Sequence, residues 1–330
     1  DPEMILGADR VIELGPGAGE NGGQIVFDGT PAALKRAKTA TGVAMKSNGA
    51  VKRRRREPSG WIELTGASGH NLRKVDVAFP RGAMTCVTGV SGSGKSSLVL
   101  ETLLPAVQRK LGLKSNGAPL SHDKIKGFAS LHGVVGVDQA PLGRTSRGNA
   151  ATYLKIWDVF RKRFAATRLA KERGYKPGIF SFNVAGGRCE ACRGDGAETV
   201  EMQFLADVVF SCPECQGRRF IGPVLDVEYE DMNVADVLQL TAQQAAEHFA
   251  DDKAIAKALR PMLDVGLGDL RIGQPLNTLS GGEAQRLKVA EALVRAEPGS
   301  LIVLDESNAG LQGKDFEPLM LLLEALFVRG

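Results

Sequence analysis

The segment Gly89-Val90-Ser91-Gly92-Ser93-Gly94-Lys95-Ser96 matches the phosphate-loop pattern G-x-x-x-x-G-K-[ST] in full. An apolar, β-branched run over residues 84–88 precedes it and predicts a buried strand, and a helical pattern over about residues 98–112 follows it. Glycines let successive backbone N–H groups point at a phosphate, and the following helix directs its positive end to the same place. The order of strand, glycine-rich loop and helix therefore predicts an α/β ATPase that binds ATP.

Two side chains of this loop have expected roles. Lys95 would neutralise the β- and γ-phosphates, and the hydroxyl of Ser96 would be a ligand of Mg²⁺. The residues that we expect to contact ATP here are Gly89, Ser91, Gly92, Ser93, Gly94, Lys95, Ser96 and Ser97. A fortuitous glycine-rich turn is the alternative, but it would place an unpaired Lys95 at a helix N-terminus, where a positive charge is unfavourable.

A second motif follows the signature pattern of ABC-type ATPases, Leu279-Ser280-Gly281-Gly282-Glu283-Ala284-Gln285-Arg286. A serine and two glycines at the start of a helix make another helix end that faces phosphate, so ATP could bridge two such half-sites. The expected ATP contacts of this motif are Ser280, Gly281, Gly282 and Glu283.

The apolar run 301–304 predicts a short buried strand that ends in the acidic pair Asp305-Glu306. Asp305 would hold Mg²⁺ through water, and Glu306 would orient or deprotonate the attacking water. Taken alone such a pair says little, but after the phosphate loop and the signature, in this order, it indicates a catalytic site. Gln139 lies where ABC-type ATPases have a glutamine that senses Mg²⁺ and the γ-phosphate; taken alone it would be an ordinary loop residue.

Four of the five cysteines form two C-x-x-C pairs in the pattern C-x₂-C-x₁₉-C-x₂-C, which is a zinc-site spacing. The expected zinc ligands are Cys189, Cys192, Cys212 and Cys215. Four thiolates fill the tetrahedral shell of Zn²⁺, so the metal would be structural rather than catalytic. Gly194 and Gly217 each stand two residues past a pair, where a knuckle turn needs a residue without a Cβ. A redox dithiol is the competing interpretation, and the remaining Cys86 is expected to be a buried small residue.

Between the two pairs, alternating apolar residues over 200–204 and 208–210 predict a hairpin that brings the cysteines together. Arginines crowd both knuckles, and a stiff, arginine-rimmed hairpin suits contacts to the backbone of nucleic acid. The expected nucleic-acid contacts are Arg188, Arg193, Arg218 and Arg219. A solvated basic face is the alternative, and the net charge of +4 is too small to decide between the two.

Composition divides the chain into three parts. The first part is residues 1–45, of which residues 1–34 alternate short apolar runs with glycine clusters and so predict two strands joined by a glycine-rich turn. Residues 46–60 hold a dense basic block at 52–56 flanked by Gly, Ser and Pro, and we interpret them as a solvated linker, although the block could also touch phosphate. Residues 61–330 alternate strands and helices, which predicts an α/β domain with a largely parallel sheet, interrupted by an inserted helical and zinc-hairpin module over about 115–278.

These elements in this order resemble the UvrA family, whose ATPases find damaged DNA in bacterial nucleotide excision repair. The resemblance is carried by the segments 137–145, 174–183 and 187–196 as well as by the ATPase motifs, and it covers nearly the whole chain. It implies that residues 61–330 are a second ABC nucleotide-binding domain and that residues 1–45 are the end of a first.

The resemblance implies an ATP-dependent DNA-binding ATPase that recognises damaged duplex DNA, uses ATP, Mg²⁺ and Zn²⁺, forms a homodimer and works with a helicase-like partner of the UvrB type. Ser307-Asn308 stands where the family usually has Pro-Thr, and Ser97 replaces a common threonine, which fits a divergent paralogue. A UvrA-like protein that protects DNA outside repair, for example against a self-made intercalator, therefore stays open. The motor subunit of a membrane transporter is another alternative, against which the zinc insertion counts.

No stretch approaches the roughly 18 consecutive apolar residues of a membrane helix, and residues 1–4 lack the plan of a signal peptide, so we expect no membrane contact and a cytoplasmic location. Relative to the family, both ends of the chain look cut. An ABC site is completed by a signature from another domain and by a histidine after the strand that follows Glu306, whereas the four histidines of this chain all precede Asp305. We therefore expect the chain alone to bind ATP but to hydrolyse it poorly.

Overall fold

The structure, a computed structural model, describes residues 2–15, 24–46, 57–115, 117–138, 140, 142, 147–200 and 208–305. The chain forms two compact units, which are Asp1–Gln139 with Ala292–Gly330 (unit 1) and Ala140–Glu291 (unit 2). The basic block 52–56, the pair Ser307-Asn308 and two expected catalytic residues, Gln139 and Glu306, lie outside the described residues.

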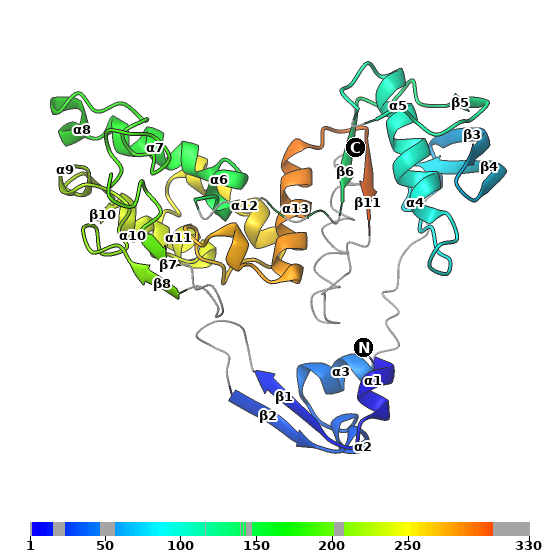
Figure 1. The fold of residues 1–330 in the computed structure, drawn as a ribbon, viewed down its shortest axis with the longest axis horizontal. Coiled ribbons are helices and arrows are strands. Elements are labelled where there is room, and N and C mark those ends of the chain that lie inside the picture. The colour runs from blue at the N-terminus through cyan, green and yellow to red at the C-terminus, as the bar shows by residue number, and fades with distance from the viewer. Residues whose placement is uncertain are drawn as a thin grey trace. The chain divides into compact units, whose positions relative to one another are not determined.

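Short elements make up the N-terminal segment (Figure 1). They are α1 (Pro2–Gly7), β1 (Val11–Gly15), β2 (Gln24–Gly29), α2 (Pro31–Leu34) and α3 (Ala40–Lys46). The strands β1 and β2 pair antiparallel, as their sequence predicts, with a register shift between Glu13 and Leu14. Thr30 begins α2, because its hydroxyl accepts a hydrogen bond from the backbone N–H of Ala33.

The rest of unit 1 contains an antiparallel sheet and a parallel strand pair. Its elements are β3 (Gly60–Gly69), β4 (Leu72–Arg81), α4 (Lys95–Leu98), the π-helical turn Val99–Leu103, α5 (Leu104–Lys110), β5 (Lys124–Lys126), β6 (Gly133–Val137) and β11 (Ser300–Leu304). Strand β3 lies between β4 and β5 with antiparallel pairing, whereas β6 and β11 run parallel. The buried side chains of Ile62, Leu64, Leu103 and Val107 join these elements in one core.

Two expectations for unit 1 are wrong. Residues 84–88 form no strand and are exposed, including Cys86, which was expected to be buried. A buried strand needs hydrogen-bonded neighbours, and no described strand pairs with this segment. Among the described strands only β6 and β11 pair in parallel, so this part of the chain is not the largely parallel sheet that the alternation of strands and helices predicts.

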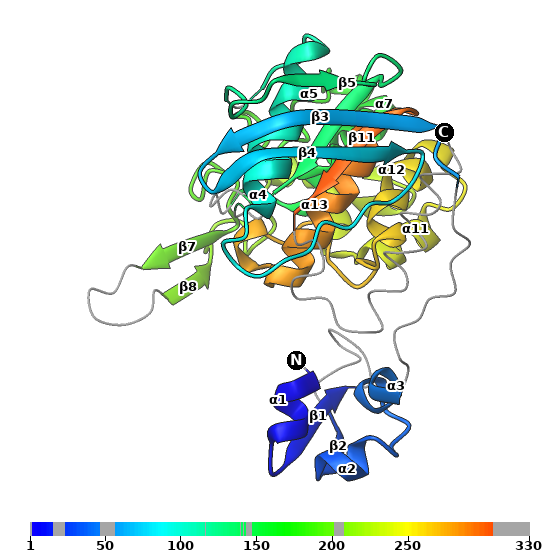
Figure 2. The same cartoon turned by 90° about the vertical axis from the view of Figure 1, so that its right-hand side faces the viewer.

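Unit 2 is mostly helical. Its elements are α6 (Ala150–Tyr153), α7 (Ile156–Ala166), α8 (Arg168–Glu172), β7 (Ala197–Val200), β8 (Val208–Ser211), α9 (Gly222–Leu225), β9 (Glu228–Tyr229), β10 (Met232–Asn233), α10 (Val234–Gln239), α11 (Ala242–His248), α12 (Lys253–Asp264), the 3₁₀ turn Leu276–Thr278 and α13 (Gly281–Arg295), in which the boundary with unit 1 falls. Helix α7 buries Ile156, Trp157, Phe160 and Phe164, which share one face at helical spacing. Figure 2 shows the antiparallel hairpin of β7 and β8 projecting beyond these helices. None of the described helices is long and apolar enough to cross a membrane.

A buried carboxylate ties α7, α12 and β9 together. Asp252 caps α12 by accepting hydrogen bonds from the backbone N–H groups of Ala254 and Ile255. The same carboxylate, only 7% exposed, binds the guanidinium of Arg163 at 2.5 and 2.8 Å and the hydroxyl of Tyr229 at 2.8 Å. The arginine holds the pKa of Asp252 well below its usual range, and burial raises the pKa of Tyr229 to about 12.

Candidate zinc and nucleotide sites

Four buried cysteines meet in unit 2, and they are the four that the sequence pattern selects. The Sγ atoms of Cys189, Cys192, Cys212 and Cys215 all lie within 4.8 Å of one another. The Sγ atoms of Cys192 and Cys215 are 3.7 Å apart, and none of these residues forms a disulfide. A tetrahedral zinc with Zn–S bonds of about 2.3 Å separates its sulfurs by about 3.8 Å, whereas a disulfide joins them at about 2.05 Å. The cluster therefore has the dimensions of a structural zinc site.

The first knuckle is closed by a backbone turn that only glycine fits. The N–H of Gly194 donates to the carbonyl of Cys189 at 3.1 Å, and Gly194 has φ +88°. A Cβ on Gly194 would lie 1.8 Å from the carbonyl oxygen of Phe182. Gly217, in the second knuckle, has φ +82°, but a Cβ there would meet no atom closer than 3.9 Å. The predicted need for glycine is thus steric and conformational at Gly194 and only conformational at Gly217.

Burial and backbone hydrogen bonds shift the pKa values of three of the thiols. It raises the pKa of Cys192 and raises that of Cys215 to about 12, whereas backbone N–H groups that donate to the sulfur lower the pKa of Cys212. A thiol whose burial disfavours the charged form needs a positive partner to become a thiolate, and a coordinated metal ion supplies that charge. A redox dithiol, in contrast, needs an accessible thiolate of low pKa. The buried cluster favours metal binding over redox exchange.

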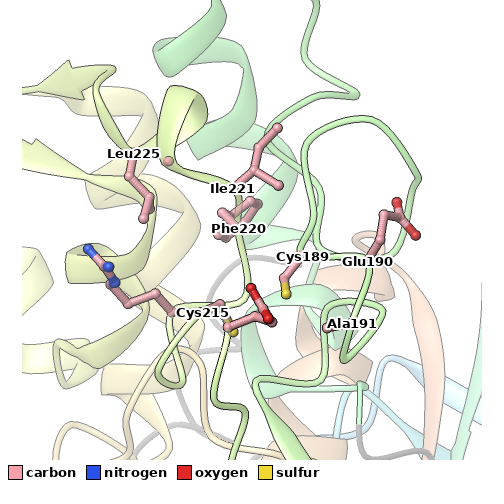
Figure 3. Close-up of a pocket in the computed structure, with 10 residues that line it drawn as sticks. Cys189, Glu190, Ala191, Cys215, Phe220, Ile221 and Leu225 are labelled. Carbon is pink, nitrogen blue, oxygen red and sulfur yellow. The ribbon is translucent and has the colours of Figure 1, made fainter.

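A pocket beside the cluster lets solvent approach it from one side (Figure 3). Cys189 and Cys215 form part of its wall, together with the apolar side chains of Phe220, Ile221 and Leu225. Both cysteines are nevertheless only 5% exposed. The thiols are thus enclosed by the module itself.

The four arginines that were expected to contact nucleic acid have different surroundings. Arg193 and Arg218 are exposed. The guanidinium of Arg188 is 3.2 Å from the carboxylate of Glu190, and its side chain is only 16% exposed. These three residues remain candidates, with the most accessible charge on Arg193 and Arg218.

Arg219 does not fit that expectation. Its guanidinium lies over the ring of Phe182, 5.4 Å from the centroid, and its Nη2 donates to the carbonyl of Gly273 at 3.2 Å. Burial lowers the pKa of Arg219, and the negative charge of Asp195 opposes this effect. The backbone of Arg219 adopts φ +69°, which turns the side chain into unit 2 instead of towards solvent. The residue is engaged within the fold and does not offer its charge to a phosphate.

The phosphate loop has the glycine geometry that its pattern predicts. Gly92 and Gly94 have φ of +76° and +97°, which side chains with a Cβ rarely adopt. The amino group of Lys95 donates to the carbonyls of Gly89 and Val90, each at 2.9 Å, and so lies against the loop backbone. The exposed hydroxyl of Ser96 follows directly.

One contact to this loop was missed from the sequence. The side-chain amide of Asn71, in the turn between β3 and β4, donates to the carbonyl of Gly92 at 2.6 Å. The same amide lies close to Gly94, where a Cβ would meet its oxygen at 2.9 Å. No local motif marks Asn71, because its role depends on a turn that precedes the loop by a full strand.

The signature serine begins α13. Its hydroxyl accepts a hydrogen bond from the N–H of Glu283, while the carboxylate of Glu283 accepts bonds from the N–H and the hydroxyl of Ser280, at 2.8 and 2.9 Å. This reciprocal cap leaves Gly281 and Gly282 as the first residues of the helix. Glu283 therefore orients Ser280, a role that the sequence analysis missed although the S-x-x-E spacing of these two residues is that of a capping box.

Asp305 directly follows β11. Its N–H donates to the carbonyl of Val137 at 3.0 Å, so the parallel pair of β6 and β11 ends at this acidic residue. Ligands of open α/β sheets bind at the carboxyl ends of parallel strands. Asp305 thus stands where the sequence predicts a Mg²⁺ contact, while Gln139 and Glu306 are outside the described residues.

Comparisons with known proteins find relatives along the whole chain. The chain is 46% identical to "UvrABC system protein A" of Listeria innocua over 331 residues, which is 99% of this chain and 34% of that relative. It is 45% identical to "UvrABC system protein A" of Methanothermobacter thermautotrophicus over 335 residues. The crystal structure of UvrA2 from Deinococcus radiodurans superimposes on it with a TM-score of 0.88 and 47% identity, covering all of this chain and 40% of that one.

No family model matches the sequence. The chain spans about a third of the length of the curated relatives that it matches. The structural match confirms the expected α/β fold of an ABC-type ATPase with an inserted cysteine module.

Proposed function

Because this chain belongs to the UvrA family, we propose that it is part of an ATP-dependent DNA-binding ATPase that recognises damaged DNA in nucleotide excision repair. The observation that carries the proposal is the match of the whole chain, at about 46% identity, to proteins named UvrABC system protein A. The four-thiol cluster and the capped signature helix, both in unit 2, add to its support.

ATP would be held at two separate surfaces of the chain. The glycines of the phosphate loop direct backbone N–H groups at the phosphates, and Lys95 neutralises their charge once it leaves the loop carbonyls. Ser96 and Asp305 would hold a Mg²⁺ ion, which would offset the negative charge of the phosphates. Ser280, fixed by Glu283, would face the phosphate of a nucleotide held by another domain.

Hydrolysis would depend on residues that follow the two parallel strands. Glu306 would orient or deprotonate the attacking water, and Gln139 would sense the γ-phosphate. In the sequence they follow Asp138 and Asp305, the described residues that come directly after β6 and β11.

DNA would be held mainly through its phosphates. Arg193 and Arg218 stand on the zinc module with exposed side chains, and structural zinc would keep the knuckles rigid behind them. Homodimerisation, a UvrB-type partner, a cytoplasmic location and the division into a first-domain tail (residues 1–45), linker and second domain belong to the same proposal.

A protective paralogue is the second candidate. The identity to UvrA2 is 47% and the identity to a protein named UvrABC system protein A is 46%, so the degree of identity does not decide which role this chain has. The test is ultraviolet survival of a bacterial strain whose own UvrA carries this chain in place of the matching segment. Restored survival, lost again with Lys95→Ala, supports repair. No restoration, with the hybrid protein stable and still binding DNA in response to ATP, would assign the chain to DNA protection instead.

A further inference from the structure

Each zinc knuckle carries one charged side chain that links it, directly or through a neighbouring segment, to the residues that lead into the signature. From the second knuckle, Arg219 reaches Gly273, whose carbonyl accepts from its Nη2 at 3.2 Å. The guanidinium also lies over the ring of Phe182, 5.4 Å from its centroid. Because its donor is charged, this contact is stronger than a hydrogen bond of the same geometry between neutral groups.

The first knuckle makes a second connection. Asp195, whose N–H donates to the carbonyl of Cys192, forms an ion pair of 3.6 Å with Arg147. The next residue, Gly148, accepts the N–H of Leu276 at 2.8 Å. The second knuckle thus connects to the stretch 273–276 directly, through Arg219, and the first knuckle connects to it through Arg147 and Gly148.

That stretch has little freedom of its own. The N–H of Gly273 donates to the carbonyl of Leu238 at 2.8 Å, and a Cβ on Gly273 would lie 2.7 Å from that oxygen. Pro275 forms an isolated bridge with Asn149. A 3₁₀ turn over Leu276–Thr278 follows and leads to the signature serine. A displacement at Gly273 would therefore be passed on to Ser280 rather than absorbed.

Arg219 is unfavourable for stability at its position. Its backbone has φ +69°, which is uncommon for a residue with a side chain, and its Nη1 is buried without a hydrogen-bond partner among the described residues. A partly satisfied buried guanidinium lowers stability compared with an apolar side chain of similar size. Such strain persists where geometry at that point serves function.

We propose that Arg219 and Asp195 are positioning residues that couple the zinc module to the signature serine, Ser280. Occupation of the module by DNA and occupation of the signature by nucleotide then influence each other through the 273–276 stretch. The identity of these two ligands rests on the proposed function, whereas the mechanical link between module and signature does not.

The link is tested by hydrogen exchange in the full chain, measured over residues 273–283 and over the first knuckle, with zinc content determined in each sample. Arg219→Gln should keep one zinc and a protected knuckle while exchange over 273–283 rises about tenfold, the effect of losing a charged hydrogen bond. Arg219→Lys, which keeps the charge and one donor, should restore most of the protection. Arg218→Gln is the matched control and should leave residues 273–283 unchanged.

If exchange over residues 273–283 is the same in Arg219→Gln as in Arg218→Gln, the proposal is wrong. If Arg219→Gln loses its zinc, the link is tested with Arg219→Lys and Asp195→Asn instead. Exchange over 273–283 that is raised in either variant while zinc is bound supports the link. Exchange at the wild-type rate in both variants refutes it.

Addition of a random-sequence DNA duplex distinguishes this link from the proposed function. In the wild type, DNA should slow exchange over 273–283, and in zinc-bound Arg219→Gln it should slow exchange only at the knuckles. DNA that protects 273–283 equally in both proteins contradicts the coupling. Failure of the wild type to bind DNA contradicts the proposed function, while the measurements without DNA still decide the link.

Discussion

Alanine at Gly194 and alanine at Gly217 should affect the zinc module very differently, although the two glycines occupy equivalent places in the two knuckles. Both have positive φ, of +88° and +82°, so each substitution forces alanine into a left-handed conformation at about 1 kcal/mol. At Gly217 that is the whole effect, because a new Cβ would lie 3.9 Å from its nearest neighbour.

At Gly194 the new Cβ would lie 1.8 Å from the carbonyl oxygen and 2.8 Å from the carbonyl carbon of Phe182. Phe182 is fully buried and carries the ring on which Arg219 rests, so its backbone cannot retreat freely. Overpacking against fixed backbone adds roughly 1–3 kcal/mol to the conformational term. Gly194→Ala should therefore destabilise the module by about 2–4 kcal/mol, against about 1 kcal/mol for Gly217→Ala.

The assay is zinc release to a chelator that competes at equilibrium, together with urea unfolding of the zinc-bound protein. Gly194→Ala should release zinc at least about thirtyfold more readily than the wild type, and Gly217→Ala only about fivefold. Equal release by both variants would refute the steric reasoning, because it would mean that the Phe182 backbone moves aside at no cost.

Three further results are expected. Asp252→Asn should lower the free energy of unfolding at pH 7, measured in urea, by about 2 kcal/mol, because the buried carboxylate loses its charge. The pKa of Asp252 in the folded protein is held below its unfolded value. The difference between wild type and variant should therefore be full above about pH 4 and vanish as the pH falls further. Asn71→Ala should weaken binding of a fluorescent ATP analogue about fivefold by freeing the carbonyl of Gly92, and wild-type affinity would count against a positioning role for that amide. DNA affinity should fall steeply with salt, and Arg193→Glu with Arg218→Glu should weaken it and flatten the salt dependence; a wild-type slope in the double variant would exclude these arginines as phosphate contacts.

The sequence predicted best where chemistry dictates spacing. The two C-x-x-C pairs brought four thiols into one buried cluster, because metal ligands must converge whatever surrounds them. The helical pattern predicted over about 98–112 is present as α4, the π-helical turn Val99–Leu103 and α5. The apolar run 301–304, predicted to be a strand, is present as β11.

Prediction failed where the outcome depends on neighbours distant in sequence. The run 84–88 is apolar enough for a buried strand, but a strand is buried only when other strands pair with it. Arg218 and Arg219 are adjacent and alike in sequence, yet one is exposed and the other packs on Phe182. Their difference arises from a left-handed backbone at Arg219, which no arginine-rich pattern encodes.

ATP-dependent recognition of damaged DNA can be tested by measuring the affinity of the zinc-bound chain for two duplexes, one with a single bulky lesion and one undamaged. Each affinity is measured with and without ATP and Mg²⁺. The proposal predicts that nucleotide changes the affinity or the preference for the lesion, and that Lys95→Ala, which removes the charge at the phosphate loop, abolishes the change while leaving nucleotide-free binding intact. DNA affinities that are the same with and without ATP, or a response to ATP that survives Lys95→Ala, would contradict ATP-dependent DNA recognition by this chain.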